Sequence, residues 1–122
     1  MSAQPQRREE PAAPLPPGFE VAARLEEIAE GTLLGVVTES GRAICLARWR
    51  GEVHALVDRC THQHYPLSSG SLERDGTVLC VWHGASFDCR TGAVRHPPAE
   101  APVRTHEVRI VDGTVLVGPE RR

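Results

Sequence analysis

Residues 58–99 contain almost no apolar run of strand length, and this limits the possible folds more than any other feature of the chain. The same stretch holds three of the four cysteines and four of the six histidines. A segment so poor in apolar periodicity needs another source of order, and metal coordination supplies it in many small domains. The sequence therefore predicts a segment organised by metal.

Two short motifs within this segment each pair one thiolate with one imidazole. They are Cys60-Thr-His62 and Cys80-Val-Trp-His83, and seventeen residues separate them. Two thiolates and two imidazoles suit either zinc or an iron–sulfur cluster. Structural zinc sites usually begin with two cysteines two to four residues apart, whereas here each loop contributes one cysteine and one histidine. The pattern favours a two-iron unit clamped between two loops, with a zinc-stabilised interaction module as the alternative.

Strand-length segments flank this stretch on both sides. Three precede it, at residues 32–38, 43–49 and 53–57, with turn residues between them. After position 100, Glu107–Val111 alternates between polar and apolar residues, Asp112-Gly113 suits a type I′ turn, and Thr114–Val117 returns. Short strands at this spacing are typical of an antiparallel sandwich or barrel. Glu20–Glu30 is different, because its apolar residues recur at helical spacing and on periodicity alone predict a short amphipathic helix.

The composition of the chain excludes several classes of function. Residues 1–17 hold five of the ten prolines and predict a disordered tail. The formal charge of −2 gives no basic stripe for nucleic acid, and no run of about eighteen apolar residues exists to cross a membrane. Arg7-Arg8 is not followed by an apolar segment, so we expect a cytoplasmic protein. Four cysteines in that setting favour metal ligands or buried thiols over disulfides.

The motifs together resemble the Rieske ferredoxins over residues 19–118. The resemblance rests on the ordered string Cys-Thr-His, Pro66-Leu67, Cys-x-x-His-Gly-x-x-Phe-Asp, Thr91-Gly92 and Pro97-Pro98-Ala99. It implies an all-β Rieske fold, an antiparallel β-sandwich of three sheets in residues 18–118. A small cluster-binding subdomain, at about 58–99, forms its tip. It also implies a strand and a short turn over residues 20–30, and we follow it there in place of the helix.

The resemblance also implies one [2Fe–2S] cluster and its ligands. Cys60 and Cys80 hold one iron, and His62 and His83 hold the other. His64 competes with His62, but the Cys-x-His spacing of the family favours His62. The resemblance further implies that Leu67, Trp82, Gly84, Ala85 and Pro97 surround the cluster and its ligands. We expect Gly84 to let the backbone approach the cluster.

Departures from the family pattern indicate the subtype. High-potential relatives carry an extra cysteine in each cluster loop, joined as a disulfide, and the matching positions here are Tyr65 and Trp82. The same relatives place Ser and Tyr hydroxyls near sulfur, where this chain has Ala85 and Phe87. Ser86 is one place out of register. Without these donors the sequence predicts a low potential.

The resemblance implies an electron carrier with no catalytic residue of its own. Both irons would be fully ligated, which leaves no open position for a substrate. The family points to a soluble ferredoxin that carries single electrons from a ferredoxin reductase to a terminal oxygenase. The alternative within the same class is the small subunit of an NADH-dependent nitrite reductase, with the large subunit as partner. No metal role is expected for His54, His96 or His106, and structural roles are expected for Cys45 and Cys89.

Overall fold

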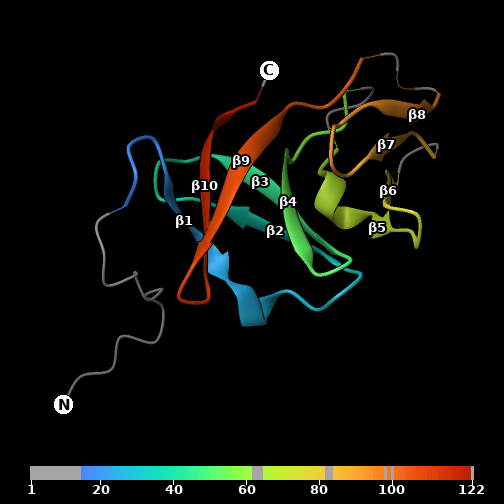
Figure 1. Cartoon of the computed structure of the whole chain (residues 1–122). Helices are drawn as coiled ribbons and strands as arrows, with labels where there is room; N and C mark the ends of the chain where they lie inside the picture. Colours follow the sequence, from blue (N-terminus) through green and yellow to red (C-terminus); the bar gives the residue numbers. More distant parts are fainter. Residues whose placement is uncertain (1–14, 62–64, 82–83, 98, 100, 122) are drawn as a thin grey trace.

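The computed structural model describes residues 15–61, 65–81, 84–97, 99 and 101–121, and these form two antiparallel β-sheets (Figure 1). The larger sheet has the strand order β1-β10-β9-β4-β3-β2, and the smaller has the order β5-β6-β7-β8. The strands of the larger sheet are β1 (Glu20–Arg24), β2 (Leu33–Val37), β3 (Ala43–Trp49), β4 (Glu52–Val57), β9 (Thr105–Val111) and β10 (Thr114–Glu120). Those of the smaller sheet are β5 (Ser71–Leu72), β6 (Thr77–Leu79), β7 (Ser86–Asp88) and β8 (Val94–His96). Two single-turn 3₁₀ helices, η1 (Leu25–Glu27) and η2 (Leu67–Ser69), complete the described elements.

The structure confirms the antiparallel all-β class and corrects the number of sheets. Three sheets were expected, but β9 pairs with β10 on one side and with β4 on the other. The β4–β9 pairing is short, with Ala55 opposite His106 and Leu56 opposite Thr105. This pairing joins the strands outside residues 58–99 into a single six-stranded sheet, so the described residues form two sheets.

Two hairpins owe their tightness to pairs of residues with positive φ. The predicted turn between β9 and β10 has φ of 52° at Asp112 and 76° at Gly113. The turn between β3 and β4 has φ of 53° at Arg50 and 79° at Gly51. Positive φ at both central residues defines a type I′ turn, whose twist matches that of paired strands. The prediction of the first hairpin from Asp-Gly is therefore confirmed.

Residues 20–30 follow the resemblance and not the helical periodicity. They form strand β1 followed by η1. The Arg24 amide donates to the Glu27 carboxylate at 2.7 Å, which closes the turn after the strand. Ala22 and Ala23 are both buried although they are adjacent, because the pairing with β10 is irregular between Val21 and Ala23. Such a bulge disrupts strict alternation, and it explains why periodicity favoured a helix.

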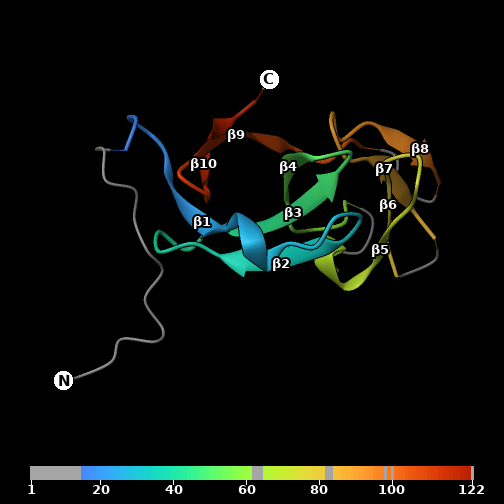
Figure 2. The same ribbon diagram turned by 60° about the horizontal axis from the view of Figure 1, so that its bottom comes forward.

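Two apolar clusters form the core. One lies within the larger sheet and contains Ile44, Leu46, Val115 and Val117. The other lies between the sheets and joins residues of β3 and β4, such as Ala47 and Leu56, to Val78 and Phe87 of the smaller sheet. Figures 1 and 2 show the smaller sheet at one end of the larger one. The indole of Trp49 fastens the two together by donating to the Arg74 carbonyl at 2.9 Å. No helix among the described residues is long and apolar enough to cross a membrane.

Asp88 fixes the turn between β7 and β8. Its carboxylate accepts hydrogen bonds from the Arg95 guanidinium at 2.6 Å and from the Arg90 amide at 2.8 Å. Burial acts to raise the pKa of Asp88, but these hydrogen bonds outweigh it and lower the pKa to about 2. Because the folded pKa lies below the ordinary value of 3.8, the ionised carboxylate stabilises the folded state.

This depressed pKa gives a pH-dependent prediction. At pH 6, Asp88→Asn is expected to unfold at a lower urea concentration than the wild type. The stabilisation by Asp88 is complete above the pKa of the unfolded chain and is lost as the pH falls through the folded value. The difference between the two proteins should therefore shrink as the pH falls from about 4 toward 2. Urea unfolding followed by circular dichroism measures it, and a difference that stays constant over that range would contradict the assignment.

Candidate metal centre

Two loops that carry the predicted cysteine ligands close in the same way. We call residues 60–65 the first cluster loop and residues 80–85 the second. In the first, the Cys60 amide donates to the Tyr65 carbonyl at 2.7 Å, and in the second the Cys80 amide donates to the Ala85 carbonyl at 2.7 Å. Each loop therefore closes over the same number of residues, with its cysteine at the beginning.

The two cysteines meet in one buried cluster. Cys60 and Cys80 are at most 1% exposed and belong to the apolar cluster between the sheets. Leu67 and Ala85, two of the residues expected to surround the iron–sulfur cluster, are fully buried in the same apolar cluster. All four cysteines of the chain are described and none forms a disulfide. Two buried thiols from two similarly closed loops fit the thiolate half of a cluster that bridges the loops.

The base of the first cluster loop is clamped by a carboxylate. Asp58 accepts a hydrogen bond from the Ser68 amide at 2.7 Å and another from the Ser68 hydroxyl at 2.6 Å. Gly35 of β2 lies against this pair, and a Cβ at that position would overlap the Ser68 side chain. Thr61 donates to the Ala101 carbonyl at 2.7 Å and ties the loop to the segment before β9. Sequence reasoning missed this clamp, because nothing in the two residues marks them as partners.

The second cluster loop is a hairpin between β6 and β7, where Leu79 pairs with Ser86. Gly84 is exposed and has a φ of +74°, and a Cβ there would meet no described atom within 4 Å. The expected reason for this glycine, a close approach of the backbone to the cluster, stays a prediction. The left-handed backbone conformation itself favours glycine here. Pro97 follows β8 and is exposed.

The expected ligands His62 and His83, with their neighbours His64 and Trp82, lie outside the described residues. Among the residues that the structure does describe, no three His, Cys, Asp or Glu side chains gather as a metal site. The structure thus places both cysteines in one buried apolar cluster, while all four ligand assignments stay a prediction from the motifs.

Ala85, just before β7, and Ser86 and Phe87 on β7 are the positions that bear on the predicted potential. Ala85 and Phe87 are fully buried in the cluster between the sheets. The hydroxyl of Ser86, between them, lies 3.0 Å from Nδ1 of His96 on β8. Because this hydroxyl is engaged with His96, we expect that Ser86 does not replace the missing hydroxyls.

The remaining cysteines and histidines have positions consistent with structural roles. Cys45 and Cys89 are fully buried, and burial raises the pKa of both thiols, that of Cys89 to about 11. His106 lies on β9, with Nδ1 2.8 Å from the Gly118 carbonyl oxygen. His54 lies on β4, and its pKa is lowered chiefly by burial.

Comparisons with known proteins agree with this geometry. The family model described as the Rieske [2Fe–2S] domain matches residues 19–107. The 3-phenylpropionate/cinnamic acid dioxygenase ferredoxin subunit of Escherichia coli strain K12 is 35% identical over 79% of this chain and 89% of its own. The Sphingomonas yanoikuyae B1 ferredoxin superposes with a TM-score of 0.77 at 29% identity, over 82% of this chain and 97% of its own.

A further solved structure shows a relative with its partner. A chain in the complex of reduced oxygenase and oxidized ferredoxin in carbazole 1,9a-dioxygenase superposes with a TM-score of 0.78 at 26% identity. The match covers 86% of this chain and 96% of that one. The fold, the paired cluster loops and these relatives agree. The chain therefore belongs to the Rieske [2Fe–2S] family, as a ferredoxin that carries one [2Fe–2S] cluster and transfers electrons.

Proposed function

We propose that this chain carries single electrons from a ferredoxin reductase to a terminal oxygenase, with Cys60, Cys80, His62 and His83 as the ligands of its cluster. The observation that carries the proposal is the pair of similarly closed loops, each beginning with a buried cysteine. The names of the relatives, which are ferredoxins of dioxygenase systems, support the oxygenase as acceptor. They lend no support to a nitrite reductase partner or to a zinc module.

The residues around the site suit outer-sphere electron transfer. When bound, a Rieske cluster takes up and releases one electron, and two imidazoles in place of two thiolates make its reduction easier. Leu67, Ala85 and Phe87 keep water from the cysteine side, because all three are fully buried. The Asp58–Ser68 clamp and the Thr61 hydrogen bond hold the first loop in place. Loops held in this way change little in structure when an electron is transferred, which keeps the reorganisation energy small.

The proposal includes a cytoplasmic location. Four cysteines without a disulfide are typical of proteins kept in a reducing compartment.

Reconstitution tests the proposed function as a whole. The holoprotein, mixed with a ferredoxin reductase, a terminal oxygenase and its aromatic substrate, NADH and dioxygen, should couple NADH oxidation to product formation. Omission of the holoprotein should abolish the coupling, and coupling that persists without it would refute the proposal.

The potential of the cluster is expected at the bottom of the Rieske range, which spans roughly −150 to +300 mV. Ala85→Ser and Phe87→Tyr should each raise it, because each adds a hydroxyl within the apolar cluster that contains Cys60 and Cys80. Ser86→Ala is the matched control and should leave it unchanged, because that hydroxyl is engaged with His96. Redox titration followed by the visible spectrum measures all four proteins. A wild-type value well above about +100 mV would show that another donor reaches the sulfurs.

A further inference from the structure

Arg59 immediately precedes Cys60 and is exposed at the base of the first cluster loop. Most arginines in the described part of the chain use their guanidinium groups internally, against carboxylates, carbonyl oxygens or aromatic rings. Within that part, only Arg59 and Arg74 make no such contact. Arg74 lies in the turn between β5 and β6, whereas Arg59 is next to a predicted cluster ligand.

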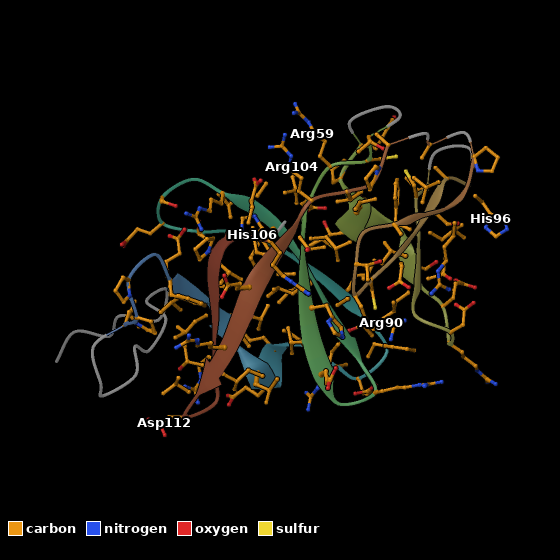
Figure 3. All side chains as sticks on the ribbon, turned by 45° about the horizontal axis from the view of Figure 1, so that its top comes forward. Arg59, Arg90, His96, Arg104, His106 and Asp112 are labelled. Atoms are coloured by element: carbon orange, nitrogen blue, oxygen red, sulfur yellow. The ribbon has the colours of Figure 1, made fainter. Side chains whose placement is uncertain are left out.

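A second positive charge lies next to Arg59. The Arg59 amide donates to the Val57 carbonyl at 2.7 Å, and the Val57 amide donates to the Arg104 carbonyl at 2.8 Å. Figure 3 shows Arg59 and Arg104 side by side at one end of the molecule. The Arg104 side chain is 77% exposed and contacts one carboxylate, that of Glu120, at 3.3 Å. Two guanidinium groups and the Glu120 carboxylate lie exposed here, whereas the Asp58 carboxylate next to Arg59 is partly buried and engaged by Ser68. We call Arg59 and Arg104 the basic corner.

Apolar side chains are exposed on the cluster loops themselves. Of the large apolar residues exposed in the described part of the chain, Tyr65 and Val81 lie on the two cluster loops, and Val37 and Ile110 lie elsewhere. Tyr65 is 40% exposed and Val81 is 60% exposed. An apolar centre with charge at its edge is the usual composition of a docking surface, in which the charges set orientation and association rate.

We propose that the redox partner docks over the cluster loops and places a surface carboxylate against Arg59. The inference rests on the proposed function, because it concerns the partner of the same site. The chain as a whole carries a formal charge of −2, so its net charge does not attract an acidic partner. The exposed guanidinium of Arg59 supplies a positive charge beside the cluster loops. An acidic partner is therefore steered to the end from which the electron leaves.

Small redox ions test the local charge without a protein partner. The reduced holoprotein is mixed in stopped flow with ferricyanide, a trianion, or with tris(1,10-phenanthroline)cobalt(III), a trication; each takes one electron. At an ionic strength of 0.1 M, charges act over only about 10 Å. Arg59→Glu should slow ferricyanide about fivefold and speed the cobalt complex. Arg74→Glu makes the same change in net charge and should alter either rate less than about twofold. Equal effects of the two variants would overturn the inference.

Electron transfer to the reconstituted terminal oxygenase tests whether the partner presents a carboxylate to Arg59. The rate at which the oxygenase oxidises the reduced wild type should fall as salt rises. Arg59→Glu should lower the low-salt rate about tenfold and flatten its salt dependence, Arg59→Gln should lie between, and Arg74→Glu should match the wild type. Each variant must retain the wild-type visible spectrum and potential. If the wild type passes no electron, the proposed function fails; if it does and Arg59→Glu matches Arg74→Glu, only the docking inference fails.

Discussion

His62→Ala is expected to yield protein without the visible absorption of a cluster, whereas His64→Ala should keep it. The first cluster loop places Cys60 in the core, and the Cys-x-His spacing then assigns the next ligand to His62. Loss of that imidazole leaves one iron with an open position, and the cluster is lost or never assembled. The two histidines are two positions apart, so each variant controls for general damage to the loop.

The visible spectrum and the iron content per chain measure both variants. A cluster that survives His62→Ala and disappears in His64→Ala would mean that the ligand assignment is out of register by two residues. If both variants lose the cluster, circular dichroism shows whether they still fold. Folded apoprotein in both cases would mean that both imidazoles are needed, which would contradict the assignment of His62 alone.

Gly70→Ala is expected to lower the free energy of unfolding by about 3 kcal/mol or more. Gly70 follows η2 and donates its amide to the Leu67 carbonyl at 2.9 Å. A Cβ at this position would overlap the carbonyl oxygen of Leu79, the residue directly before Cys80. Because both partners are backbone, no side-chain rotation relieves the overlap. The substitution therefore pushes the two cluster loops apart.

Gly31→Ala is the matched control for this prediction. Gly31 has a φ of +80°, but a Cβ there would meet nothing within 4 Å. Its cost is the backbone conformation alone, about 1–2 kcal/mol. Urea unfolding of the holoprotein, with the visible spectrum recorded in parallel, compares the two. A Gly70 variant as stable as the Gly31 variant, with a full complement of iron, would contradict the close approach at Leu79.

Local chemistry explains which parts of the fold could be predicted from the sequence. The hairpin after position 100 was predictable because Asp112-Gly113 specifies its own turn and the flanking residues alternate. Residues 20–30 were not predictable from periodicity, because an irregular pairing with β10 disturbs the alternation. The merging of the expected sheets depends on two residue pairs between β4 and β9, about fifty positions apart in the chain. No local pattern reports such a pairing.

The candidate site divides in the same way. The motif spacing predicted that Cys60 and Cys80 serve one site, and both lie in the same buried cluster. The clamp between Asp58 and Ser68 could not be predicted, because it depends on how a ten-residue segment closes. The exposed guanidinium of Arg59 could not be predicted either, because the sequence does not show which arginines lack an internal contact.

Metal and sulfide analysis of the purified protein tests the central claim most directly. Protein made with iron available is assayed for iron, acid-labile sulfide and zinc, and the electrons that it accepts are counted by reductive titration. We predict two irons, two sulfides and one electron for each chain, with negligible zinc. One tightly bound zinc for each chain, without sulfide and without any electron uptake, would contradict the assignment of this chain as an electron carrier.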